Sequence, residues 1–296
     1  MSGPDYDLTE GTMINQQRQK AERFPRLHHG PDTLVLPNAW DVMSAVIFEQ
    51  ASFKAIGTTS YAIAASHGYP DGQQIPFGEM LEVIARIART TDLPVTADIE
   101  AGYGKDVAGV VETVRRVIET GVAGINIEDS TGNPEQPLLD TGLQCERLKA
   151  VRETAVSVGI PLVINARTDT YLISSSDPDA RYQETVKRAN SYRQAGADCI
   201  FIPGPLDGEL IARLVAAIDA PINIFATPVT PTVPELRKLG VARLSIGPGA
   251  FRTALACMKK IAAELAEQGT YQTLFSETLT KADVDGLLHR PAKRES

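Results

Sequence analysis

Short apolar, β-branched runs alternate with segments of helical periodicity along nearly the whole chain. Runs of this length, bounded by glycine, proline and polar residues, are typical of buried strands. They predict strands at 33–37, 55–59, 94–99, 123–128, 161–166, 198–202, 221–225 and 242–246. The amphipathic segments predict helices at 42–50, 78–91, 107–120, 143–158, 180–195, 206–218, 231–239 and 249–268. Glycines that follow several of these helices are predicted to cap them, namely Gly121, Gly159, Gly196 and Gly240.

This regular alternation predicts an α/β protein with a parallel sheet. Eight strands and eight helices are the number that closes into a (β/α)8 TIM barrel, which is the fold class we predict. An open doubly wound sheet is the alternative, but no GxGxxG fingerprint follows the first strand. We expect a polar N-terminal extension at 1–30 with a helix over 11–24, a barrel at 31–268, and a helical tail at 269–296 whose apolar residues pack on another surface, such as a neighbouring subunit.

Composition narrows the choice of function. The chain has 296 residues, 43% of them hydrophobic, and a net charge of −8, which argues against a nucleic-acid-binding protein. An anionic substrate stays possible, because a metal ion or local arginines can set the charge of one pocket. Cys145, Cys199 and Cys257 are too far apart for a zinc motif or a disulfide framework. No run reaches membrane-spanning length and no signal-peptide core is present, so we expect a cytoplasmic protein.

Acidic residues stand where two successive predicted strands end. Asp98 and Glu100 follow one strand, and Glu128 ends the next. Residues two apart on a strand share a face, and like charges on one face are unfavourable unless a cation lies between them. Hard oxygen ligands suit Mg²⁺, which keeps several waters and binds few protein carboxylates. The alternative is that one acid caps a helix and the other is solvated. We favour a metal site, with Asp71 as an outer member, although its PDG sequence is also an ordinary turn signal.

Other polar residues near these strand ends are candidate substrate contacts. Arg167 offers a planar fork to a carboxylate or phosphate, or else an ion pair to Asp169 or Glu128 that holds the barrel mouth. A run of hydroxyl residues ends the second strand and could hold the far end of a small dianion, although such runs are often only strand ends; it comprises Thr58, Thr59, Ser60 and Tyr61. His67 is a candidate acid–base group or a structural histidine.

Several motifs together resemble the isocitrate lyase/phosphoenolpyruvate mutase superfamily. They are PNAWD, GYPDG, PVTADIEAGYG, GINIED, INARTD, AGADCIF and GVARLSIGP, spread over roughly 34–267. The resemblance implies a TIM barrel, often a tetramer that exchanges its eighth helix between subunits, with bound Mg²⁺ (or Mn²⁺) and a 2-oxo acid ligand. By motif, Asp98 is similar to the inner metal ligand and Arg167 to the substrate arginine. Glu100, Glu128 and Asp71 match water-mediated ligands, and the hydroxyl run matches a carboxylate-binding turn.

The loop after Glu128 departs from the well-known members of that superfamily. Residues 129–140 read DSTGNPEQPLLD and contain no cysteine, histidine or lysine. The Lys-(Lys/Arg)-Cys-Gly-His motif of the isocitrate and methylisocitrate lyases is therefore missing, and so is the loop lysine of the phosphonomutases. The chain is most similar to the mutase-like branch, which includes enzymes that act on oxaloacetate and other small oxo acids.

The sequence thus leads to one main hypothesis and two alternatives. The first is a Mg²⁺-dependent lyase that cleaves or decarboxylates a small 2-hydroxy or 2-oxo di- or tricarboxylate through an enolate, with residues 129–140 closing over the site. Its proton donor is open among His67, Tyr61 and Tyr103. The second is a phosphonate P–C bond enzyme of the phosphoenolpyruvate mutase or phosphonopyruvate hydrolase type. The third is a non-catalytic barrel that binds oxo acids. In each case we expect a homo-oligomer.

Overall fold

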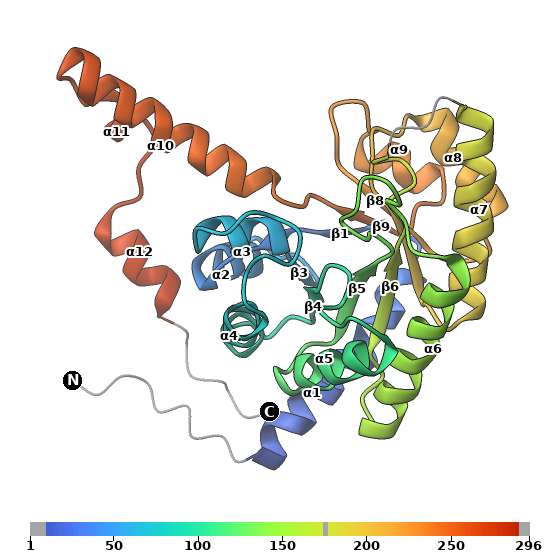
Figure 1. Cartoon of the computed structure of the whole chain (residues 1–296). Helices are drawn as coiled ribbons and strands as arrows, with labels where there is room; N and C mark the ends of the chain where they lie inside the picture. Colours follow the sequence, from blue (N-terminus) through green and yellow to red (C-terminus); the bar gives the residue numbers. More distant parts are fainter. Residues whose placement is uncertain (1–9, 174–176, 290–296) are drawn as a thin grey trace.

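The computed structural model describes residues 10–173 and 177–289, and its centre is a parallel sheet curved into a barrel (Figure 1). The sheet order is β1-β9-β8-β7-β6-β5-β4-β3-β2, and every pairing is parallel. The strands are β1 (Leu34–Leu36), β2 (Asn38–Ala39), β3 (Ile56–Thr58), β4 (Val95–Asp98), β5 (Gly124–Glu128), β6 (Val163–Arg167), β7 (Cys199–Ile202), β8 (Ile222–Phe225) and β9 (Arg243–Ser245). All eight predicted strand positions are therefore occupied.

The barrel closes because the first predicted strand, at 33–37, is followed at once by a second short strand that faces a different neighbour. Pro37 lies between β1 and β2 and has no N–H to donate to a ladder. β1 pairs with the last strand, β9, whereas β2 pairs with β3. One continuous segment thus joins both edges of the sheet, so the predicted TIM-barrel class is confirmed and an open sheet is excluded.

Helices follow the strands and surround the barrel. They are α1 (Glu10–Arg23), α2 (Val42–Gln50), α3 (Ser60–Ser66), α4 (Phe77–Thr90), α5 (Val107–Glu119), α6 (Thr141–Val158), α7 (Pro178–Gln194), α8 (Gly208–Ala217), α9 (Val233–Lys238), α10 (Gly249–Gln268), α11 (Gln272–Ser276) and α12 (Lys281–Leu288). The short 3₁₀ helix η1 (Pro25–His28) follows α1. Every helix predicted between strands is present within about two residues, and the capping glycines at 121, 159, 196 and 240 all have positive φ.

One element differs from the sequence-based expectation. The hydroxyl run at 58–61 is not a simple strand end, because the chain turns into helix α3 at Ser60. Thr59 is the N-cap, and its hydroxyl accepts a hydrogen bond from the Ala62 N–H at 3.4 Å. A threonine hydroxyl at the N-cap stabilises the start of a helix, because it accepts from a backbone N–H of the first turn. The helix lies in a seven-residue stretch rich in alanine, which is too short to give a clear periodic signal.

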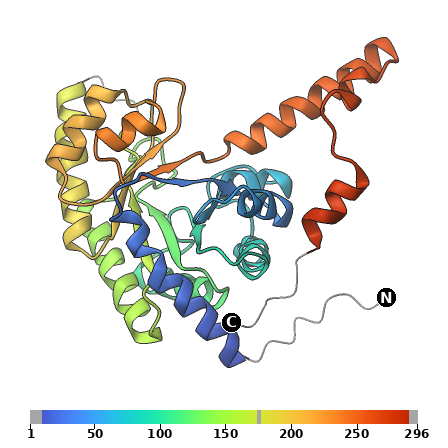
Figure 2. The ribbon, with the colours of Figure 1, turned by 180° about the vertical axis from the view of Figure 1, so that it is seen from behind.

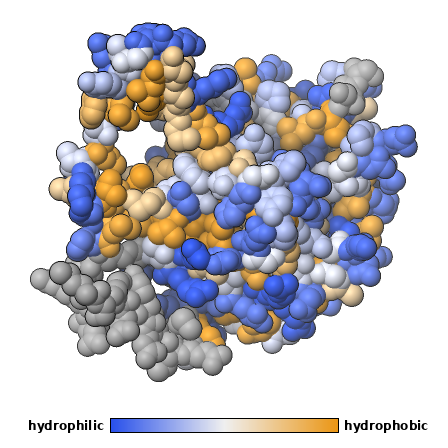
Figure 3. Space-filling model, turned by 60° about the vertical axis from the view of Figure 1, so that its left-hand side comes forward, coloured by the Kyte–Doolittle hydropathy of each residue, from blue (hydrophilic) through white to orange (hydrophobic). Residues whose placement is uncertain are grey.

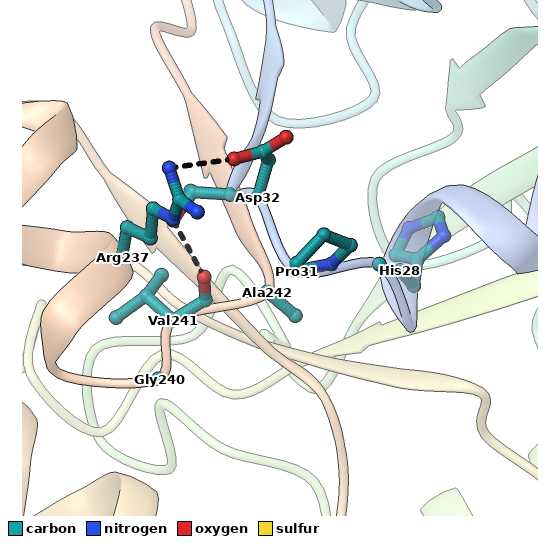
Figure 4. Close-up of a pocket in the computed structure, with 9 residues that line it drawn as sticks. His28, Pro31, Asp32, Arg237, Gly240, Val241 and Ala242 are labelled. Carbon is teal, nitrogen blue, oxygen red and sulfur yellow. Dashed lines mark hydrogen bonds and ion pairs between the residues drawn. The ribbon is translucent and has the colours of Figure 1, made fainter.

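The N-terminal segment closes the end of the barrel where the strands begin. Figure 2 shows helix α1 running across this end of the molecule. The Gln17 side chain donates to the carbonyls of Ile118 on α5 and of Val122 just before β5. Phe24 is completely buried beneath the barrel core. A cavity of about 110 Å³ lies at the same end, lined by η1, the segment before β1 and the turn before β9 (Figure 4). The Asp32–Arg237 ion pair, 2.9 Å long, stands at this cavity, on the side of the barrel opposite the acidic strand ends.

The C-terminal segment extends away from the barrel as an arm, residues 249–288. Helix α10 projects outward, α11 folds back beside it, and α12 returns toward α2 (Figure 1). Among the described side chains of α10, only Phe251 is buried. Figure 3 shows hydrophobic residues gathered on the side of the arm that faces the barrel, across an open space. The division of the chain into extension, barrel and tail at 30 and 268 stays a prediction.

Candidate active site

Charged side chains from neighbouring strands meet where those strands end. Asp98 is the last residue of β4, Glu128 of β5 and Arg167 of β6. In the sheet register Glu128 lies beside Arg167, and Asp98 lies beside Asn126, two residues before Glu128. The C-terminal ends of barrel strands are where TIM-barrel enzymes build their active sites. The sequence-predicted acids and arginine are therefore brought to one end of the barrel.

Asp98 is held by the segment that connects β3 to α3. Its Oδ2 accepts hydrogen bonds from the Ser60 hydroxyl at 2.7 Å and from the Ser60 N–H at 3.1 Å. Its own backbone N–H donates to the Thr58 hydroxyl at 2.9 Å. Thr58 and Ser60 thus brace the acid, a contact that the sequence alone did not suggest. Their predicted role as substrate contacts stays a prediction, as does that of Thr59, which caps α3.

Glu100 lies in an unusual backbone conformation with both carboxylate oxygens bound. Its φ is 51°, in the left-handed region that non-glycine residues seldom adopt. Oε1 accepts from the Tyr103 hydroxyl at 2.7 Å, and Oε2 accepts from the Gln73 N–H at 2.5 Å. Burial raises the pKa of Glu100 to about 7, and the negative charges of Asp98 and Asp71 add to the rise. Glu100 therefore lies close enough to the other acids to feel their charge.

Glu128 and Asp169 flank the guanidinium of Arg167. Nη1 of Arg167 is 2.7 Å from Glu128, while Nε and Nη2 contact the two oxygens of Asp169 at 2.5 and 2.9 Å. Burial raises the pKa of Glu128 well above its ordinary value. The positive charge of Arg167 lowers this pKa, and the negative charges of Asp169 and Asp98 raise it. Arg167 is fixed by these two carboxylates and lies over the Phe201 ring, 5.8 Å from its centroid. The ion pair and the substrate role proposed for Arg167 can coexist.

Asp71 approaches the site from the loop between α3 and α4. The pKa of its carboxyl is raised by partial burial and then by the charge of Asp98. The charge of Asp98 thus raises the pKa values of Asp71, Glu100 and Glu128, which places the acids in one electrostatic cluster. A shared cation would relieve this repulsion.

The donor set fits a hydrated divalent cation better than a compact metal centre. Within residues 10–173 and 177–289, no three His, Cys, Asp or Glu side chains converge closely enough to form a ready-made metal site. Mg²⁺ does not need one, because it retains several waters and binds through one or two carboxylates. Asp98 has Oδ1 available beside the Ser60-bound Oδ2. The residues that would hold Mg²⁺ are Asp98, Glu100, Glu128 and Asp71, and the assignment of Asp98 as the direct ligand and of the others as water-mediated ligands stays a prediction.

Asp129, next to Glu128, has a structural position. It is completely buried and accepts hydrogen bonds from the Tyr192 hydroxyl at 2.7 Å and from the Asp169 N–H at 3.0 Å. Asp129 also forms an ion pair with Arg188, whose Nη1 lies 3.2 Å from Oδ2 of Asp129. Asp129 also opens the 129–140 loop, which is drawn together by a bridge between Ser130 and Leu138. The loop is thus fastened at its base, and its proposed closing movement stays a prediction.

The three candidate proton donors have distinct surroundings. The Nδ1 of His67 is 2.9 Å from the Ile63 carbonyl at the end of α3, and the side chain is exposed. Tyr61, on α3, is 40% exposed. Tyr103 is committed to Glu100, and burial beside that carboxylate raises the pKa of its hydroxyl far above the ordinary value. Of the three, Tyr103 is the one in contact with the acid cluster.

Sequence reasoning missed the polar layer beneath these acids. TIM-barrel interiors are usually filled by branched apolar residues, but here Asn126 and Asn165 lie side by side on β5 and β6 and hydrogen bond at 2.8 Å. Arg243 on β9 is completely buried and donates to Asn126 at 3.2 Å, and burial lowers its pKa to about 10. The available signal was the two-residue spacing from Asn126 to Glu128 and from Asn165 to Arg167, which places each pair on one face.

Comparison with known proteins identifies the family to which this site belongs. The family model for phosphoenolpyruvate phosphomutase matches residues 24–266, which span the whole barrel. The chain belongs to the isocitrate lyase/phosphoenolpyruvate mutase superfamily. The resemblance stated from sequence motifs is thereby confirmed.

Individual members of the superfamily are similar along most of their length. The chain is 36% identical over 232 residues to an uncharacterized protein of Mycobacterium tuberculosis, covering 78% of this chain and 84% of that one. It is 30% identical over 283 residues to 2-methylisocitrate lyase of Halalkalibacterium halodurans, covering 90% and 89%. A crystal structure from Burkholderia cenocepacia J2315 with the provisional name lyase/mutase has a TM-score of 0.87 and 33% identity, covering 94% and 98%.

Proposed function

We propose that this protein is a Mg²⁺-dependent carbon–carbon lyase that cleaves or decarboxylates a small 2-hydroxy or 2-oxo di- or tricarboxylate. The observation that carries the proposal is the position of Asp98, braced by Ser60 at the centre of a group of acids beside Arg167. Similarity to 2-methylisocitrate lyase over most of both chains supports this reaction class. When bound, Mg²⁺ would supply positive charge where an enolate develops.

Charged and hydroxyl side chains have separate roles in the proposed binding of the acid. The guanidinium of Arg167 is held in place by its contacts with Glu128 and Asp169. A substrate carboxylate would therefore bind to a group that is already oriented. The hydroxyl run is the proposed contact for the other end of the acid, and it comprises Thr58, Thr59, Ser60 and Tyr61. The loop at 129–140 would cover the site and exclude water, which strengthens electrostatic interactions inside it.

The contacts of the three candidate proton donors support one proposal. His67 and Tyr61 have side chains exposed to solvent, whereas the Tyr103 hydroxyl donates to Glu100. A proton held between Tyr103 and Glu100 lies within the acid cluster, so we propose this pair as the donor that replaces the missing loop cysteine.

A substrate panel tests the proposal directly. The purified protein is incubated with Mg²⁺ or Mn²⁺ and oxaloacetate, methylisocitrate, isocitrate, dimethylmalate or phosphonopyruvate, and products are followed by NMR. Cleavage of a carboxylic acid that depends on the metal supports the lyase. Turnover of phosphonopyruvate alone would instead assign a phosphonate enzyme, and tight binding of an acid without any turnover would assign a binding protein.

We also propose that the protein works as a cytoplasmic homo-oligomer, a dimer or tetramer in which the arm of each subunit packs on a neighbour. The arm carries exposed apolar side chains that include Leu255, Met258 and Phe275. Apolar surface of this extent on a projecting helix is typical of an interface. Among the described residues, no helix has both the length and the apolar character to span a membrane.

A further inference from the structure

Three residues with left-handed backbone conformations meet beside the acid cluster. Gln73, Glu100 and Tyr103 have φ values of 59°, 51° and 52°. Each such conformation is unfavourable in a residue other than glycine and persists only when its surroundings hold it. Strained backbone of this kind clusters at functional sites, so its coincidence at three linked positions calls for a physical explanation.

The three residues hold one another through a closed ring of hydrogen bonds. The Gln73 N–H donates to Glu100 at 2.5 Å, and the Tyr103 hydroxyl donates to the other oxygen of Glu100 at 2.7 Å. The Tyr103 N–H then donates to the side-chain Oε1 of Gln73 at 2.6 Å. The ring joins two segments about thirty residues apart, namely the loop that carries Asp71 and the turn that carries Glu100.

The loop from 69 to 76 is attached to α4 at both ends and to the core through the buried Ile75, and the ring links its exposed middle to the turn of Glu100. The Tyr69 hydroxyl donates to Glu79 on α4 at 3.1 Å. At the other end Phe77 begins α4 and packs against Tyr103, with ring centroids 5.1 Å apart. Between them, Asp71, Gly72 and Gln73 are exposed. Gln73 therefore ties this exposed stretch to the turn of Glu100 twice, through its backbone N–H to Glu100 and through its side-chain oxygen, which accepts from Tyr103.

We propose that Gln73 is a positioning residue, whose side-chain amide fixes the Asp71 loop and the Glu100–Tyr103 turn in the arrangement that gathers the outer acids around Asp98. This inference rests on the proposed metal-dependent function. The backbone N–H of Gln73 donates to Glu100, and its side chain is proposed to contact neither the metal nor the substrate. It acts by accepting the Tyr103 N–H, which keeps Tyr103 in the conformation from which its hydroxyl reaches Glu100.

Isosteric substitution separates this role from general stability. Gln73→Met keeps the length of the side chain but removes the acceptor, and Gln73→Glu retains an acceptor at the same reach. Because Gln73 is exposed, neither change should prevent folding. The matched control is Gln74→Ala, since the Gln74 amide donates only to the Gly72 carbonyl, within its own turn, at 3.1 Å.

Two measurements on the full chain decide the proposal. Amide hydrogen exchange at Tyr103 and at residues 71–73 should become about five- to tenfold faster in Gln73→Met, the range expected for one lost hydrogen bond, and return toward wild type in Gln73→Glu. Titration with Mn²⁺, followed by electron paramagnetic resonance, should show several-fold weaker binding in Gln73→Met, with unchanged affinity and exchange in Gln74→Ala.

The outcomes are distinguishable from failure of the proposed function. Unchanged exchange at Tyr103 in Gln73→Met would overturn the positioning role, and so would faster exchange with wild-type Mn²⁺ affinity. If the wild-type protein bound no Mn²⁺ and turned over none of the acids, the proposed function would fail, and the positioning of acids for a metal would fail with it. The wild-type measurement alone identifies that case.

Discussion

Ser60 donates two hydrogen bonds to one oxygen of Asp98, from its hydroxyl at 2.7 Å and from its backbone N–H at 3.1 Å. Both groups belong to the first turn of α3, which starts at Ser60. The helix start therefore fixes the rotamer of an acid on a different strand, β4. Because Oδ2 accepts both bonds, Oδ1 is the oxygen that we propose as the ligand of the cation.

Ser60→Ala should weaken metal binding without unfolding the protein. Outer-shell partners that orient a metal-binding carboxylate typically contribute 10- to 100-fold in affinity or activity. The backbone N–H of Ser60 remains in the variant, so we expect a loss of about tenfold, measured as the Mn²⁺ dissociation constant and as kcat/KM. Ser66→Ala is the control, because the Ser66 hydroxyl donates to the Ile63 carbonyl on the same helix. Equal affinity in Ser60→Ala and wild type would contradict the bracing role.

Asp98→Asn should abolish both turnover and Mg²⁺ binding. The amide keeps the size of the side chain and can still accept from Ser60, so the change removes charge and leaves shape nearly intact. Asp106→Asn is a control of the same chemistry, because the Asp106 side chain caps α5 and accepts from the Gly109 N–H at 2.8 Å. Activity and calorimetric Mg²⁺ binding are measured for both variants. Full activity of Asp98→Asn would end the proposal of a metal site at this acid.

Arg167→Met should be among the most destabilising single substitutions at the site. It leaves Glu128 and Asp169 facing each other without the cation that lies 2.7 and 2.5 Å from them. Removing one partner of a buried ion pair costs about 3–5 kcal/mol in free energy of unfolding. Urea unfolding should show such a loss, and Arg167→Met combined with Glu128→Gln should recover part of it, because one unpaired charge is then gone. A double variant no more stable than Arg167→Met would contradict this account.

The strands, most helices and the location of the acids could be predicted because each depends on local sequence. Strand ends place Asp98, Glu128 and Arg167 together in any parallel barrel, so knowing the fold class was enough. The contacts of Ser60 and Gln73 could not be predicted in this way. Each reaches a partner about thirty or more residues away through a particular loop conformation.

The buried polar layer was missed for a different reason. Asn126 and Asn165 are single polar residues within otherwise apolar strands. A sequence pattern with one such residue still predicts a strand, but it does not show what the side chain faces. Only the register of β5 beside β6 shows that the two amides are neighbours. Arg243 is fully buried although charged side chains rarely are, and no local feature of its strand indicates the Asn126 partner.

The pH dependence of stability should reveal the buried His28. Burial, followed by the charge of Arg243, lowers the pKa of His28 to about 3, below its ordinary value of 6.5. The folded state therefore contains the neutral imidazole of His28. Its contribution to the free energy of unfolding is complete above about pH 6.5. It is lost as the pH falls from 6.5 toward 3, because the unfolded chain takes up the proton first, with a slope of about 1.4 kcal/mol per pH unit.

His28→Gln isolates this contribution from that of the acids. Urea unfolding between pH 7 and pH 4.5 should show a shallower decline for His28→Gln than for wild type, by about 2–3 kcal/mol over the interval. The variant is expected to be less stable at neutral pH, since the ring packs against Phe24 at 4.9 Å. His67→Gln serves as the exposed control and should keep the wild-type slope. Parallel curves for wild type and His28→Gln would show that His28 does not titrate as the structure implies.

We expect the protein to form an oligomer through its projecting arm, and we expect one charged substitution on the arm to dissociate it. Met258 on α10 is 59% exposed and Phe275 on α11 is 66% exposed, so an arm left in water would carry a large apolar surface. We expect wild-type protein to sediment as a dimer or tetramer at micromolar concentration, and Met258→Glu to shift it toward monomer. Val156→Glu, at a 71% exposed apolar position on α6, is the matched control and should leave the assembly intact. A monomeric wild type, or equal dissociation by both substitutions, would contradict packing of the arm on a second copy.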